Sequence, residues 1–216
     1  MARALLQPVT DCLDPRVEAG ELEFRFAAGR LCLDLVLTAG ERWRRSFERL
    51  RTPADLGRWL ALSGLVTPAP KVSAADLAAA RELREAIFAL ARCAMDGRPA
   101  GAGDLAVVNE WASRPDLPPF LTRIGAAVRP ARAVSAALAT IARDAVDLFG
   151  GPLAARVREC AAPDCSGLFL DGSRAGARRW CSMAVCGNRA KVTTYRRRRA
   201  AASPHERSAR GRVASG

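Results

Sequence analysis

The sequence predicts a mainly α-helical protein that ends in a small cysteine-rich module made of a β-hairpin and a helix. Apolar residues recur at intervals of three and four over residues 73–96 and 134–148, as on the buried face of an amphipathic helix. Four of the seven cysteines lie within 27 residues near the C-terminus. We therefore expect a helical domain over residues 1–151, the cysteine-rich module over 152–199 and a disordered basic tail over 200–216.

The first part of the helical domain carries mixed signals. Residues 22–26 alternate apolar and charged side chains, which predicts a short strand. Residues 30–38 are apolar enough for either a strand or a buried helix, and their pattern does not decide between the two. Residues 42–51 place Trp43 and Phe47 at helical spacing. A short β element within a helical domain is therefore expected here.

The following helices have clear boundary signals. Thr52 and Pro53 are typical N-cap and first-turn residues, and they predict a helix that ends near Leu62. Ser73 and Asp76 resemble a capping box at the start of the longest helix. Two more helices are expected over residues 104–113 and 134–148, separated by a proline-rich loop over 114–132 and ended by residues 150–152, which read Gly-Gly-Pro.

The four clustered cysteines form two pairs with the same spacing. Cys160 and Cys165 are separated by four residues, as are Cys181 and Cys186. Four thiolates fill the tetrahedral shell of one structural zinc ion, and the odd total of cysteines in a reducing compartment favours zinc over the alternative of two disulfides. The Asp-Gly pair at residues 171–172 predicts a hairpin turn, so we expect a zinc-ribbon-like or treble-clef-like module.

Several functional classes are disfavoured by the composition. The only histidine, His205, lies in the polar tail, so His-dependent catalysis is not expected. Asp34, Glu41 and Glu48 are acidic residues without a recognisable base or metal partner. We therefore expect no enzyme. No apolar run approaches the roughly 18–20 residues that span a bilayer, and the first 14 residues lack a signal-peptide core. A soluble, cytoplasmic protein without membrane contact is expected.

The net charge of +12 is concentrated near the C-terminus. Residues 1–155 hold 20 basic and 18 acidic side chains, whereas residues 156–216 hold 14 basic and 4 acidic ones. Arginine makes up 32 of the 34 basic residues, so the position of the charge is more informative than its residue type. A locally basic module favours a polyanionic partner, either DNA or RNA.

Nine basic residues near the cysteines are the candidate nucleic-acid contacts. Arg189 has an equally plausible structural role near the zinc turns, because its fork can bond carbonyl groups. Trp180 is expected to be core more than a stacking platform. Val185, Val192 and Tyr195 are expected to form the inward face of the helix over residues 184–199. The candidates are Arg174, Arg178, Arg179, Arg189, Lys191, Arg196, Arg197, Arg198 and Arg199.

Residues 160–191 closely resemble the CGNR zinc finger, named for the run that here is Cys186-Gly187-Asn188-Arg189. Residues 29–36 and 55–65 resemble the helical ABATE domain that usually precedes this finger, although Leu37 stands where the family has asparagine. The resemblance implies a bacterial, stress-linked transcriptional regulator whose finger binds nucleic acid. Further positions that match the finger are Phe169, Asp171, Ser173, Arg174, Arg178, Arg179, Trp180, Cys181 and Ser182.

The leading functional hypothesis is a zinc-finger regulator whose finger and basic helix contact phosphates of DNA or RNA. The alternative is a protein-interaction adaptor that docks on an acidic partner of the transcription machinery. The helical domain would then bind a small ligand or a protein, or form a dimer; the sequence does not distinguish these. A redox switch at the zinc thiolates is compatible with the leading hypothesis.

Overall fold

The computed structural model describes residues 23–40, 42, 47–121, 123, 125, 127–128, 133–163 and 165–201. By its internal contacts the chain divides into two units, Met1–Cys181 and Ser182–Gly216. Several residues singled out in the sequence lie outside the described residues. They are Glu41, Trp43, His205 and the expected basic tail beyond residue 201.

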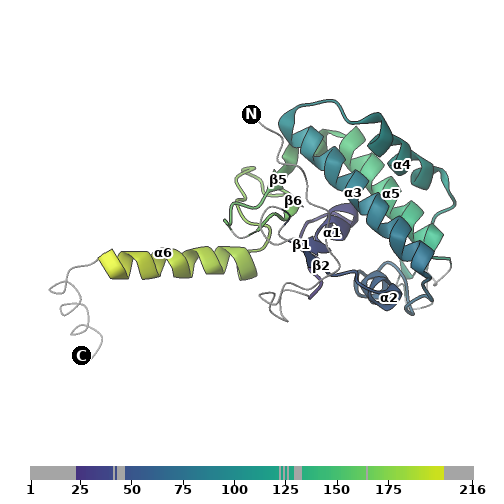
Figure 1. Cartoon of the computed structure of the whole chain (residues 1–216), viewed down its shortest axis with the longest axis horizontal. Helices are drawn as coiled ribbons and strands as arrows, with labels where there is room; N and C mark the ends of the chain where they lie inside the picture. The colour runs from purple at the N-terminus through teal and green to yellow at the C-terminus, as the bar shows by residue number, and fades with distance from the viewer. Residues whose placement is uncertain are drawn as a thin grey trace. The chain divides into compact units, whose positions relative to one another are not determined.

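Three helices form the body of the first unit: α3 (Ala74–Asp96), α4 (Ala102–Ser113) and α5 (Val134–Gly150). They pack against one another (Figure 1). The predicted apolar stripes of α3 and α5 are buried, which confirms both helices. The capping box of Ser73 and Asp76 is present at the start of α3. Gly97 ends the helix at φ 63°, a left-handed conformation that favours glycine.

The ambiguous segments near the N-terminus have a definite structure. Residues 30–38 form the helix α1 (Leu31–Val36), which contacts α3 and α5. The described part of residues 22–26 is not a strand, so that prediction was wrong. Its aromatic rings instead pack on side chains of α2 (Pro53–Leu62), with Phe26 and Trp59 centroids 5.9 Å apart. Because α2 already provides an aromatic contact for this segment, the segment does not need to pair with another strand to pack against the fold.

A two-stranded pairing replaces the helical spacing seen at residues 42–51. In the described part of that segment, β2 (Phe47–Glu48) pairs antiparallel with β1 (Ala39–Gly40). Gly40 makes the pairing possible, because a Cβ there would lie 2.2 Å from the ring of Phe47. The helical prediction is therefore wrong for residues 47–48. The spacing of apolar residues in this segment carries no information about the contact of the Phe47 ring with Gly40.

A buried ion pair joins this β element to α3. Arg84 donates two hydrogen bonds to the carboxylate of Glu48, both 2.7 Å long. The two side chains are each 2% exposed. Arg84 also donates to the hydroxyl of Thr38 over 3.1 Å. Because both charged groups are removed from water, loss of either one would leave the other buried without its counter-charge.

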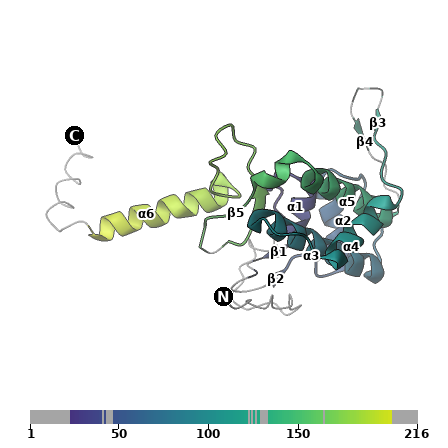
Figure 2. The same ribbon diagram turned by 90° about the horizontal axis from the view of Figure 1, so that it is seen from above.

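The remaining strands of the first unit are short. β3 (Phe120–Leu121) and β4 (Ala127–Val128) pair within the proline-rich segment, and Figure 2 shows them away from the helical layer. A short 3-10 helix, η2 (Pro152–Arg156), leads from α5 into β5 (Val157–Glu159). β5 pairs antiparallel with β6 (Leu168–Leu170), with Val157 opposite Leu170.

The hairpin of β5 and β6 has a different turn from the one expected. Its loop is formed by residues 160–167, so the prediction of a hairpin turn at residues 171–172 was wrong. The hairpin is attached to the helical layer at two points. Arg92 of α3 forms a 2.6 Å ion pair with Glu159, and the Leu170 amide donates to the Ala28 carbonyl over 2.7 Å. The first cysteine pair is therefore carried by an anchored hairpin loop.

The second unit consists, in its described part, of a π-helical turn and one helix. The turn is η3 (Met183–Gly187), and it continues into α6 (Asn188–Ala201), the yellow-green helix of Figure 1. Val192 is 47% exposed and Tyr195 is 63% exposed. The predicted inward face is thus solvent-exposed, because no further element of the described part of this unit lies against it.

Candidate functional site

The sulfur atoms of Cys160, Cys165, Cys181 and Cys186 lie within 4.8 Å of one another. Cys165 and Cys181 are 3.7 Å apart at sulfur, far longer than the roughly 2.05 Å of a disulfide bond. Four thiolates at about 2.3 Å around a tetrahedral zinc ion would be separated by about 3.8 Å. The donor set and spacing therefore fit one structural zinc ion, as predicted, and not the alternative of two disulfides.

The hairpin loop presents the first two ligands through a tight turn. The Cys165 amide donates to the carbonyl of Ala162 over 3.0 Å, and the Cys160 amide donates to that of Gly167 over 2.9 Å. A Cβ on Gly167 would lie 3.2 Å from the sulfur of Cys165 and 3.5 Å from that of Cys181. Glycine at this position therefore leaves room for the sulfurs to converge.

Hydrogen bonds to sulfur stabilise the thiolate form of the ligands. The Gly167 amide donates to Cys165 and the Cys181 amide donates to Cys160, both over 3.4 Å. In the second unit, a guanidinium nitrogen of Arg189 lies 3.6 Å from the sulfur of Cys186. Such donors offset the negative charge of a tetrathiolate site. A zinc ion held by four protein thiolates has no open position for water, so its role is structural.

Asp171 organises the loop that leads to Cys181. Its carboxylate is 1% exposed and accepts hydrogen bonds from the Ser173 amide, the Ser173 hydroxyl and the Arg178 amide. The hydrogen bonds from Ser173 hold the pKa of this carboxyl below its usual range. In the sequence, Asp171 was interpreted as part of a hairpin turn and as a position that matches the finger, without a hydrogen-bonding role. The Asp-x-Ser spacing, typical of a local Asx turn, is the signal that could have identified this role.

Arg178, a predicted nucleic-acid contact, is engaged within the first unit. Its guanidinium donates to the carbonyls of Ala27 and Trp180 over 3.0 and 2.8 Å, and also to the carbonyl of Cys181. It lies over the ring of Phe169 at 4.6 Å from the centroid. The guanidinium therefore joins the zinc loop to the segment before α1, which gives Arg178 a structural role.

The other predicted basic residues lie mostly at the surface. Arg174 and Arg179 are exposed on the loop before Cys181, and Arg179 lies 5.1 Å from the ring centroid of the half-buried Trp180. Arg189 lies beside the Cys186 thiolate, which agrees with a structural role. The other exposed candidates are all on α6: Lys191, Arg196, Arg197, Arg198 and Arg199.

The acidic residues considered as catalytic candidates serve the fold where they are described. Glu48 is bound by Arg84. Asp34 accepts a 2.9 Å hydrogen bond from the Ala28 amide, and burial raises its pKa to about 6. Cys32 is fully buried, and this burial raises the pKa of its thiol. Cys93 is half-buried and unlinked.

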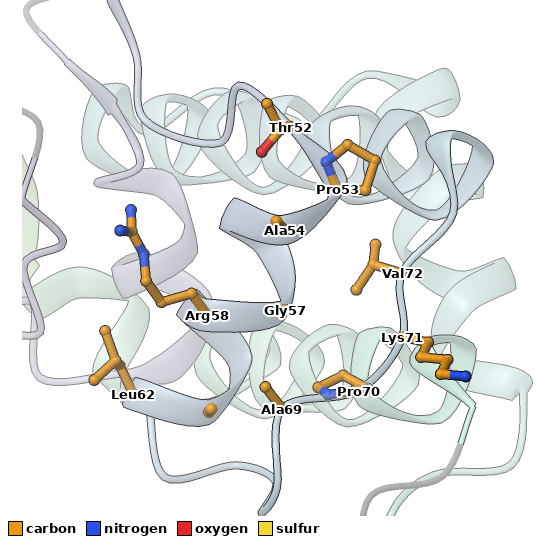
Figure 3. A pocket seen from close by; sticks show the side chains of 11 residues that line it. Thr52, Pro53, Ala54, Gly57, Arg58, Leu62, Ala69, Pro70, Lys71 and Val72 are labelled. Carbon is orange, nitrogen blue, oxygen red and sulfur yellow. The ribbon is translucent and has the colours of Figure 1, made fainter.

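The first unit has two notable surface pockets. One of about 910 Å³ lies between α2 and residues 69–72, lined largely by small and apolar side chains (Figure 3). The other, of about 350 Å³, lies between α3, α4 and α5. Neither gathers a set of catalytic groups. Among the described helices, none is both long and apolar enough to cross a membrane.

The fold and the cysteine site together define a helical domain followed by a four-cysteine zinc finger. Residues 29–152 match the ABATE family model, described as "Putative stress-induced transcription regulator". Residues 156–199 match the CGNR zinc finger model. The chain belongs to the ABATE family and carries a CGNR zinc finger, as the sequence indicated. Neither description names an enzyme, and a comparison with curated proteins found no match.

Proposed function

We propose that the protein is a nucleic-acid-binding transcriptional regulator whose finger and basic helix contact the phosphates of DNA or RNA. The observation that carries this proposal is the charge of α6. Residues 188–201 contain six basic residues and no acidic one, and the side chains of residues 191–199 are all exposed. Exposed cations on a helix that has no acidic residue of its own create a positive surface that attracts an external anion.

The domain assignment in this proposal is a regulatory domain over residues 1–151, a finger over 152–199 and a basic tail over 200–216. The two family matches, at residues 29–152 and 156–199, support a division near residue 152. The zinc ion would serve the finger by holding the hairpin loop and the start of α6 together. The helical domain would receive a signal or bind a second molecule.

The test measures binding of zinc-loaded, full-length protein to duplex DNA and to structured RNA across a salt series. Neutralising phosphates releases counterions, so the affinity should fall steeply as salt rises. Affinity that is absent, or that does not change with salt, would contradict the proposal. Zinc analysis and sequencing of co-purified nucleic acid, done on the same preparation, would identify the metal and the type of nucleic acid.

A further inference from the structure

The side chains of α6 are distributed unequally around the helix axis. At about 3.6 residues per turn, one arc of roughly 120° holds Lys191, Val192, Tyr195, Arg198 and Arg199, which we call the contact face. All five side chains are exposed. The face therefore combines three cations with the apolar side chains of Val192 and Tyr195. Along the helix, Lys191 precedes these two residues, and Arg198 and Arg199 follow them.

The opposite side of α6 has a different character. It carries the small residues Ala190, Thr193 and Thr194 together with Arg197. Arg189 and Arg196 lie between this side and Val192, so each half of the helix holds three cations, and the two halves differ mainly in their apolar side chains. The hydroxyl of Thr194 donates back to the carbonyl of Ala190 over 2.9 Å, so this group is satisfied within the helix. Arg197 is exposed, of the same residue type as Arg198 and adjacent to it in sequence. The two arginines therefore differ chiefly in the face of the helix on which they lie.

Resting on the function proposed above, we infer that the contact face of α6 enters the major groove of duplex DNA. The helix has 14 residues, which is about 21 Å or the length of roughly six base pairs. The major groove of B-DNA is about 12 Å wide and admits a helix. Lys191, Arg198 and Arg199 neutralise phosphates or bond guanine edges, while Tyr195 and Val192 contact bases such as the thymine methyl group.

Other nucleic acids fit this face less well. The major groove of A-form RNA is deep and narrow, so a helix does not reach its base edges. Single strands are bound on platforms of several aromatic residues, whereas the contact face carries one ring, that of Tyr195. Duplex DNA is thus the polyanion whose shape and charge both match the exposed helix. Preference for A-form RNA is an outcome that the test detects.

The test compares Arg198→Gln with its matched control Arg197→Gln in the zinc-loaded, full-length protein. The probes are a mixed-sequence DNA duplex of about 20 base pairs and the corresponding RNA duplex. For DNA, Arg198→Gln should weaken binding about fivefold to tenfold and lower the salt slope by about 0.9. Arg197→Gln should change the affinity less than about twofold and leave the slope unchanged.

Two further measurements separate a groove contact from other roles of the same face. Methylation of guanine N7, which lies in the major groove, should interfere with binding, and Tyr195→Ala should weaken DNA binding without lowering Tm. Equal losses for Arg197→Gln and Arg198→Gln, or equal affinity for the RNA duplex, would overturn the groove assignment. A lowered Tm for Tyr195→Ala with unchanged affinity would do the same. Absence of any salt-dependent binding would instead contradict the proposed function itself.

Discussion

Arginine has different roles in the helical unit and in α6. In the helical unit, Arg30 binds Asp144 and Asp147, Arg84 binds Glu48, and Arg178 binds three backbone carbonyls. In α6, residues 196–199 are four consecutive exposed arginines with no acidic residue in the helix. The surroundings of an arginine, rather than its presence, therefore indicate whether it stabilises the fold or binds a ligand.

This difference agrees with the distribution of charge along the chain. The nearly balanced charges of residues 1–155 allow most cations there to find an acidic or carbonyl partner. Burial of such a pair makes each member costly to remove. An exposed helical cation contributes little to stability, so its removal should affect binding rather than folding.

The largest effect is expected from loss of a zinc ligand. Cys160→Ser should reduce bound zinc from one ion to none and unfold the finger, since structural zinc contributes about 10 kcal/mol or more to small modules. Metal analysis and urea unfolding measure both effects. Cys93→Ser, which changes a half-buried cysteine outside the cluster, is the control. Stoichiometric zinc in the Cys160→Ser protein would contradict the four-thiolate site.

A large loss of stability is also expected from breaking the buried ion pair. Arg84→Met leaves the Glu48 carboxylate buried at 3% exposure, which should lower the free energy of unfolding by about 3–5 kcal/mol. The control is Arg58→Met, because Arg58 is 60% exposed in its pair with Asp55 and should cost less than about 1 kcal/mol. If urea titrations gave equal losses of unfolding free energy for Arg84→Met and Arg58→Met, the greater importance of the buried ion pair would be contradicted.

Adjacent residues of the zinc loop offer a sharper comparison. Arg178→Gln removes hydrogen bonds from a charged donor to three carbonyls and should destabilise the first unit by about 3 kcal/mol. Arg179→Gln changes an exposed side chain and should cost less than about 0.5 kcal/mol. Thermal unfolding and zinc retention under a chelator would report the difference. If Arg179→Gln is the more damaging change, the structural role of Arg178 is wrong.

The raised pKa of Asp34 predicts that the free energy of unfolding of the helical unit depends on pH. Its pKa is raised by burial to about 6, whereas an unfolded aspartate titrates near about 3.9. Between these values the native state binds the additional proton, so this group lowers stability as pH rises from about 4 to 6. Asp34→Asn, which keeps an acceptor for the Ala28 amide, should remove that loss of about 3 kcal/mol.

The measurement is the difference in unfolding free energy between Asp34→Asn and the natural protein across this range. It should grow from pH 4 to 6 and stay constant above it. A difference that does not vary with pH would place the Asp34 pKa near its ordinary value.

The smallest effect on stability is expected from α6. Replacing Arg196, Arg197, Arg198 and Arg199 together with glutamine should change the free energy of unfolding by less than about 0.5 kcal/mol. Removing the repulsion between these like charges would raise the stability of the helix by a similarly small amount. Nucleic-acid affinity should nevertheless fall at least about tenfold. A loss of several kcal/mol would contradict this prediction and show that these side chains stabilise the fold.

Local sequence was sufficient wherever a structural rule acts over a few residues. The capping box of Ser73 and Asp76 and the N-cap at Thr52 were correctly predicted, because each bonds only to its own first turn. The buried stripes of α3 and α5 follow from helical periodicity. The zinc ligands were identified because the coordination chemistry requires four thiolates, and their paired spacing is visible in the chain.

Local sequence failed where a distant contact decides the structure. The pairing of β1 and β2 depends on the Phe47 ring lying against Gly40, and the hairpin of β5 and β6 turns through the cysteine loop rather than at Asp171. The expected inward face of Val192 and Tyr195 is exposed, because burial depends on what lies nearby in space. Contact of Arg178 with nucleic acid stays a prediction.

The family, the zinc ligands, the main helices and the concentration of positive charge near the C-terminus can all be predicted from the chain without a structure. The contacts of individual charges emerge only in the folded protein. The structure shows that Arg178 and Arg84 are bound within the helical unit and that the Tyr195 side of α6 is exposed. The physical reason is that helical periodicity, capping and metal ligation are short-range or chemically specific. Desolvation and ion pairing depend on groups brought together from distant parts of the chain.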